Sequence, residues 1–114
     1  AEHVHANELR LGGLRHRLAH QTYVDLPDGA GGVGRTFLTV DQLWGRIEYQ
    51  SESFGITSER PEGRHLARIT VRAPNTLQPG DRLVAGARVF HVEAVSDPDG
   101  RGRFSRCRCR EEQP

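Results

Sequence analysis

Glycine and proline recur so often in this chain that long helices do not fit between them. The 114 residues include 13 Gly and 6 Pro. Both residues interrupt regular elements and both are favoured in turns. Several of the short runs between them alternate apolar and polar residues, which is the pattern of a strand with one buried face. The sequence therefore predicts short strands joined by frequent turns.

Six segments carry the strand pattern. The clearest is residues 65–73, where small or aliphatic residues alternate with polar ones. Two tight turns separate later segments. One is Ala85-Gly86-Ala87, and the other is Asp97-Pro98-Asp99-Gly100, where Pro presets φ and Gly accepts positive φ. The predicted strands cover residues 14–23, 37–49, 65–73, 82–84, 88–95 and 104–110, and a loop is predicted to open at Pro27 and to run through Gly34.

These segments predict an all-β fold, a small antiparallel β-barrel or sandwich of about six strands. Only 35% of the residues are hydrophobic, so we expect a thin core. Gly45 is expected to mark a bulge or a close approach. Cys107 and Cys109 share a strand face and are expected to be small buried side chains. The expected core residues are Leu18, Leu43, Ile47, Ile69, Val71, Leu83, Val92 and Cys109.

The predicted β domain spans residues 14–112, with an N-terminal arm at residues 1–13 and a long loop at residues 50–63. The arm is polar and ends in two glycines. The loop is polar too, with Phe54 and Ile56 as its large apolar side chains. Neither segment has enough apolar residues to pack on its own domain. We therefore expect both to order against neighbouring subunits or the adjoining ring.

Charge and hydropathy argue against two classes of protein, dedicated nucleic-acid binders and membrane-spanning proteins. The net charge is +1, from 16 basic and 15 acidic residues, and every basic residue is Arg. Dedicated nucleic-acid-binding domains usually carry a strong basic excess, which is missing here. The sequence has no apolar run of 18 residues, so no membrane span is expected. Arg is suited to planar, bidentate pairing across interfaces.

Arginines alternate along two of the predicted strands, so they share strand faces. Two interpretations stay open. The arginines form a solvated face with cross-strand partners such as Glu93, or they form an interface or a stripe facing a lumen. Such a stripe would meet DNA phosphates without reading base sequence. The candidate interface arginines are Arg68, Arg72, Arg106 and Arg108.

Three patterns that resemble cofactor or catalytic sites fail in their context. The spacing of Gly29, Gly31 and Gly34 fits G-x-G-x-x-G, but a β-branched and aromatic run follows where a dinucleotide site needs a helix. His16 and His20 would lie about 13 Å apart along a strand, too far to share an ion. No nucleophile-elbow sequence surrounds any Ser. We expect no enzyme activity, no metal and no cofactor.

Five segments occur in an order and at a spacing that together match one known family. They are residues 14–18 (LRHRL), 43–48 (LWGRIE), 65–72 (HLARITVR), 88–92 with 95–101 (RVFHV and VSDPDGR) and 109–111 (CRE). Over residues 14–112 the chain resembles the phage head–tail joining family, also called head closure or stopper proteins. Connectors of gene transfer agents are similar, and the Arg-rich composition is compatible with either source.

The resemblance implies a structural function in particle assembly. It implies a homo-oligomeric ring, of six or twelve copies, with a central channel through which DNA passes and is contacted without sequence preference. The head-side partner would be a portal or adaptor ring, and the tail-side partner a tail terminator or tail tube protein. The location would be the head–tail junction of a virion or phage-like particle assembled in the bacterial cytoplasm.

The segment after Glu48 departs from the family pattern, because it lacks the usual Ser-Gly-Arg-Glu stretch. In related stoppers the equivalent loop lies toward the channel. The resemblance thus implies that residues 50–63 line or constrict the lumen, and the alternative is a loop that only grips the next ring. Nearly balanced charge would let DNA pass without a strong trap. The candidate residues of this loop are Glu52, Phe54, Ile56, Glu59, Arg60, Glu62 and Arg64.

A function of another class is a monomeric β-barrel binding module, of the SH3-like or oligonucleotide-binding type. Single-stranded nucleic acid is bound on aromatic platforms where bases stack. The chain has seven aromatic residues, and strand alternation groups no set of them on one strand face. A platform of exposed aromatic rings would favour this alternative over the ring subunit.

Overall fold

The computed structural model describes residues 14–50, 56–57 and 65–112, and this part of the chain contains seven strands and no helix. The all-β prediction is confirmed. The predicted arm, residues 1–13, lies outside the described residues, as does most of the predicted long loop. The strands are β1 (His16–Pro27), β2 (Val33–Gln50), β3 (Ile56–Thr57), β4 (Leu66–Arg72), β5 (Arg82–Ala85), β6 (Arg88–Ser96) and β7 (Phe104–Glu111).

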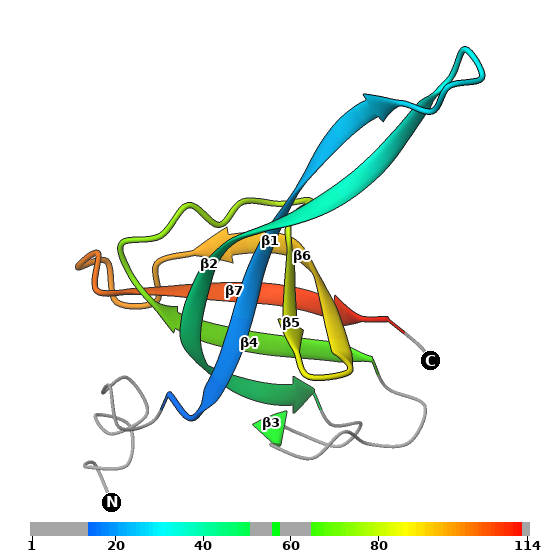
Figure 1. Cartoon of the computed structure of the whole chain (residues 1–114). Coiled ribbons are helices and arrows are strands. Elements are labelled where there is room, and N and C mark those ends of the chain that lie inside the picture. Colours follow the sequence, from blue (N-terminus) through cyan, green and yellow to red (C-terminus); the bar gives the residue numbers. More distant parts are fainter. Residues whose placement is uncertain (1–13, 51–55, 58–64, 113–114) are drawn as a thin grey trace, which may run out of the picture.

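Six of the strands form one antiparallel sheet that closes in a ring. Their order is β1-β5-β6-β7-β4-β2, and β2 pairs back with β1 (Figure 1). The short strand β3 lies inside the predicted long loop and pairs with the end of β2, where Ile56 is opposite Gln50. Closure gives each of the six strands two neighbours over part of its length, and the long free edges of β1 and β2 lie beyond their pairing with β5 and β4.

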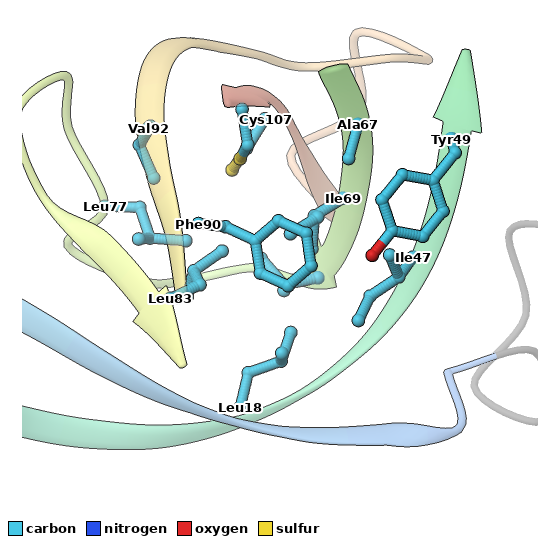
Figure 2. Packing of buried hydrophobic residues seen from close by; sticks show 12 residues of the cluster. Leu18, Ile47, Tyr49, Ala67, Ile69, Leu77, Leu83, Phe90, Val92 and Cys107 are labelled. Atoms are coloured by element: carbon cyan, nitrogen blue, oxygen red, sulfur yellow. The ribbon is translucent and has the colours of Figure 1, made fainter. Parts of the chain in front are cut away.

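Inward-facing side chains of the closed sheet form one hydrophobic cluster (Figure 2). Tyr49 and Phe90 are buried in it, with ring centroids 6.2 Å apart. Leu43 was expected in the core but is only half-buried, and it packs against the cluster from outside. The reason is that it lies in a part of β2 that pairs only with β1. The other expected core residues are all buried: Leu18, Ile47, Ile69, Val71, Leu83, Val92 and Cys109.

Gly45 marks a close approach, one of its two predicted roles. A Cβ at this position would overlap Leu18 Cδ1 and lie 3.0 Å from Val71 Cγ1. The register irregularities of the sheet lie elsewhere, between His20 and Gln21 and between Val92 and Ala94. Glycine at this position therefore lets β2 pass directly over the core, while the irregularities bend the strands around it.

The first two strands are longer than predicted, and the loop between them is shorter. The pairing of β1 with β2 continues to Pro27 and Val33, so the predicted loop is reduced to residues 28–32. The Asp28 carboxylate accepts hydrogen bonds from the N–H groups of Ala30 (2.8 Å) and Gly32 (3.0 Å). These bonds lower the pKa of Asp28 and close the turn locally, so the strands pair up to its edge.

Candidate assembly surfaces

One part of the β1–β2 hairpin projects beyond the closed sheet (Figure 1). Strand β1 pairs with β5 only at residues 19–21, and β2 pairs with β4 only at residues 45–49. Residues 22–38 therefore form strand pairs only with each other, and residues 39–44 pair with no strand but β1. We call residues 22–44 the distal hairpin. An isolated two-stranded hairpin is marginally stable in water, so the closed sheet at its root must support it.

The distal hairpin contains every large hydrophobic side chain that is exposed among the described residues. Single exposed apolar residues are ordinary, but a group on one element indicates an interaction surface. Val33 is the most exposed, at 69%, and Leu26 and Leu38 are each about half exposed. The full set is Tyr23, Leu26, Val33, Leu38, Val40 and Trp44.

Residues paired across two strands share a face, and one face of the distal hairpin already has partners. Tyr23 is opposite Phe37, with ring centroids 6.3 Å apart in an edge-on arrangement. The Arg35 guanidinium lies 3.8 Å from the centroid of Tyr23, and that of Arg82 lies 4.0 Å from the centroid of Phe37. Guanidinium groups thus cover these aromatic rings. Strand alternation missed this cluster because its members come from three strands.

The other face is aliphatic and continues the core-facing row of β1. Leu18 and His20 in this row are buried in the closed sheet, and the row then runs on through Thr22 and Val24 to Leu26. Opposite these last residues lie Leu38, Thr36 and Gly34. We call Thr22, Val24, Leu26, Thr36 and Leu38 the aliphatic face. It is a core-facing surface that extends past the core of its own chain.

A buried polar cluster holds the root of the hairpin. His20 Nε2 lies 2.7 Å from Asp81 Oδ2, and both side chains are 1% exposed. The Thr22 hydroxyl donates to Asp81 Oδ1 over 3.0 Å, and the N–H of Gln78 donates to Oδ2 over 3.2 Å. A buried carboxylate satisfied in this way fixes the groups around it. The pairing joins residues 61 positions apart, which no local sequence pattern reveals.

Arginines gather on the outer face of the neighbouring strands β2, β4, β7 and β6. The register places Arg68 beside Glu48 on one side and Arg108 on the other, and Arg106 beside Thr70. Six positive and two negative groups give this surface a net charge of +4, against +1 for the whole chain. We call it the arginine face, and its members are Arg46, Arg68, Arg72, Arg106, Arg108, Arg110, Glu48 and Glu93.

The structure brings all four candidate interface arginines onto this one surface. Glu48 lies 3.2 Å from Arg68, and Glu93 lies 3.6 Å from Arg108. Within the described residues, Arg72 and Arg106 have no carboxylate partner. Exposed ion pairs contribute little to stability. The arginine face therefore supplies concentrated positive charge and adds little to the stability of the fold.

A hollow of about 340 Å³ opens in the arginine face. Three of the arginines surround it, and Leu66 and Ala94 contribute aliphatic surface. In the described part of the chain, the buried Nε atoms of Arg68 and Arg106 have no hydrogen-bond partner. The hollow combines apolar lining with unsatisfied cationic donors, which suits an apolar segment that carries negative charge. Its lining residues are Gln50, Leu66, Ala67, Arg68, Ala94, Ser96, Arg106 and Arg108.

Most of the predicted lumen loop lies outside the described residues. Ile56 is within them, in β3 at the end of β2. Because β2 begins at the turn of the distal hairpin, the loop and that turn lie at opposite ends of one 18-residue strand. The candidates outside the described residues are Glu52, Phe54, Glu59, Arg60, Glu62 and Arg64.

The two cysteines are buried and free, as predicted. Burial raises the pKa of the Cys107 thiol to about 12, and it raises that of Cys109 as well. Within residues 14–50, 56–57 and 65–112, no group of three or more His, Cys, Asp or Glu side chains is placed to hold a metal ion. The same residues include no helix long and apolar enough to cross a membrane.

Comparison with known proteins identifies the family. The model of the phage head completion protein family matches residues 9–112. The chain belongs to this family. A structural role in a phage head, association with the virion and contact with other phage structural proteins follow from that membership. A search of the curated proteins finds no match.

Two solved structures share the fold of this head completion protein. One is a chain in the virion of a native gene transfer agent particle, with 28% identity and a TM-score of 0.68, covering 88% of this chain and 96% of that one. The other is the solution structure of protein SF1141 from Shigella flexneri 2a, with 21% identity and a TM-score of 0.63, covering 86% and 92%. The second likeness concerns the fold alone.

Proposed function

We propose that this chain is a subunit of a ring that joins the head of a phage or phage-like particle to its tail. The ring lies between a portal or adaptor ring and a tail terminator or tail tube protein, and DNA passes through its centre. It acts by burying surfaces and closing a channel, without a chemical step. The observation that carries the proposal is the distal hairpin, which holds all the exposed large hydrophobic residues of the described chain.

The closed sheet explains why contacts with neighbours use this hairpin. Where the sheet is closed, each strand already has two neighbours, so no strand of another chain can add there. Contacts must then use strand faces, loops and projecting segments. The hairpin turn and the loop of residues 50–63 leave β2 from opposite ends, so one subunit is able to contact different neighbours through them.

Contact with DNA in the channel is assigned to the long loop, and contact with phosphates reads no base sequence. The loop of residues 50–63, with its nearly balanced charge, lines or constricts the lumen and helps retain packaged DNA. The loop follows β2 directly, and β3 within it pairs with the end of that strand.

The aromatic rings do not favour a monomeric oligonucleotide-binding module. Such a module needs exposed ring faces on which bases stack. Tyr23 and Phe37 each have a guanidinium over the ring, and Trp44 has that of Arg17 at 5.8 Å. The exposed apolar surface of the described chain is mainly aliphatic, which suits a protein partner.

The proposal is tested by deleting the gene and imaging the particles that form. We expect filled heads without tails, or heads that have lost their DNA, and restoration by the wild-type gene supplied in trans. Mass spectrometry of purified particles should find the chain in a multiple of six copies. Normal tailed particles from the deletion strain, or particles that lack the chain, would overturn the proposal.

The proposal for the loop has a separate test. Residues 51–62 are replaced by a short Gly-Ser linker, and particles are assayed for tails and for retained DNA. Rings that form but leak DNA support a gate. Tailed particles with normal retention exclude a gate, and failure to join tails identifies the loop as a contact with the next ring.

A further inference from the structure

We propose that the distal hairpin of one copy docks on the arginine face of the next copy, so that each contact between subunits joins two different surfaces. This inference rests on the proposed ring and names the contact that builds it. Identical contacts between two different surfaces of one chain produce a ring when the rotation closes. The occupant of the arginine face is thus a second copy of this chain.

Charge complementarity carries the pairing. The distal hairpin contains Asp25, Asp28 and Asp41 against Arg35, a net charge of −2. The arginine face has six arginines against two glutamates, a net charge of +4. Complementary charge favours encounter, fixes register and suppresses wrong pairings.

The apolar surfaces also correspond. The aliphatic face presents Leu26 and Leu38, each about half exposed. The hollow in the arginine face contributes Leu66 and Ala94, with unsatisfied donors on Arg68 and Arg106. The aliphatic side chains fit this lining because they bury apolar area there. Asp41, opposite His20 of the same row, supplies a carboxylate on this side, whereas Asp25 lies on the other face, 3.3 Å from Arg35.

The distal hairpin and the arginine face of one chain do not contact each other. The distal hairpin projects away from the closed sheet, and the arginine face lies on the outside of that sheet over β4 and β7 (Figure 1). The hairpin root is held by the buried pair of His20 with Asp81, which opposes folding back. A hairpin fixed in this direction is preorganised for a neighbour, and that lowers the entropic cost of association.

Charge reversal on both surfaces tests the contact. The hairpin variant carries Asp25→Lys and Asp41→Lys, which changes its charge from −2 to about +2. The face variant carries Arg72→Glu, Arg106→Glu and Arg108→Glu, which changes its charge from +4 to about −2. The third variant combines all five substitutions in one chain. Arg101→Glu, on an exposed turn outside both surfaces, is the matched control.

Each variant gene is supplied in trans to the deletion strain, and complete DNA-filled tailed particles are counted. We expect the hairpin and face variants each to lose about tenfold or more of the particles, and the combined variant to recover most of them. Arg101→Glu should match the wild type, and thermal unfolding should show that every variant folds. If either single-surface variant assembles normally, or if the combined variant is not rescued, the proposed contact between copies is wrong.

These outcomes are separate from failure of the proposed function. If wild-type particles contain no copies of the chain, the ring itself is excluded. If wild-type particles contain it but the combined variant fails, the ring stands, and the two surfaces bind other proteins of the particle. If the two surfaces bound other proteins, reversing the charge of both surfaces in one chain would restore neither contact. Rescue is therefore expected only when the two surfaces contact each other between copies.

Discussion

The closed sheet and the distal hairpin of this protein differ in how far their apolar side chains are buried. In the sheet, inward side chains such as Ile69 and Phe90 are fully buried. In the hairpin, Leu26 and Leu38 lie on the aliphatic face, which continues the core-facing row of β1, but they are half exposed. Burial in the first region stabilises the fold of one chain. Exposure in the second leaves apolar surface that a partner protein would bury.

The largest expected effect separates these two uses of apolar residues. Phe90→Ala removes a fully buried ring and should lower the free energy of unfolding by about 3–5 kcal/mol. Leu38→Ala is the comparison in the hairpin and should change it by less than about 0.5 kcal/mol, because its side chain is 49% exposed. Denaturation with urea measures both. A similar loss in both variants would show that the hairpin is part of the folding core.

The polar root of the hairpin provides the second test. Asp81→Ala leaves His20 buried without its partner, and it should destabilise the protein by about 3 kcal/mol. Asp41→Ala, at an exposed site on the hairpin, serves as the control and should be nearly neutral. Hydrogen exchange of Thr22 to Leu26 should also accelerate in the Asp81 variant if the pair orients the hairpin. Unchanged exchange there would mean that strand pairing alone holds it.

Two glycines of β2 sharpen the boundary between the regions. Gly45→Ala puts a methyl group against Leu18 and Val71 and should cost about 1–3 kcal/mol. Gly34→Ala lies in the distal hairpin, where the nearest atom to a new Cβ is 3.9 Å away, and it should have almost no effect. Thermal unfolding compares the two. Equal effects would contradict the close packing of β2 at Gly45.

The smallest expected effect concerns the cysteines of the closed sheet. With its pKa raised to about 12 by burial, the Cys107 thiol stays protonated at pH 8. The native protein should therefore react very slowly with a thiol reagent, and the unfolded protein quickly. A cysteine introduced by Leu38→Cys should react at once. Rapid labelling of the native wild type would show that the core opens.

The sequence predicts the closed sheet better than it predicts the hairpin, for a physical reason. Alternation identifies strands such as β4 and their buried residues, because burial on one face imposes a period of two. It also separates the arginines from the core. Glycine and proline around Asp28, however, predict a longer loop than the structure has. Only the local bonds to the Asp28 carboxylate show that the strands continue to the turn.

Long-range contacts account for what sequence patterns miss at the candidate surfaces. Alternation placed Arg68 and Arg106 on faces of separate strands, and only the register of β4 with β7 brings them together. The pair of His20 with Asp81 depends on the neighbouring positions of β1 and β5 in the sheet. The exposure of Leu26 depends on where the pairing with β5 ends. None of these follows from neighbours along the chain.

The most direct test of the account is an image of the head–tail junction in intact particles, at a resolution that shows side chains. We predict a ring of identical subunits in which Leu26 and Leu38 of each copy are buried against the arginine face of the next. The closed sheets should keep the fold described above, since their cores are complete within one chain. Distal hairpins that point into solvent, or the absence of such a ring, would contradict the account.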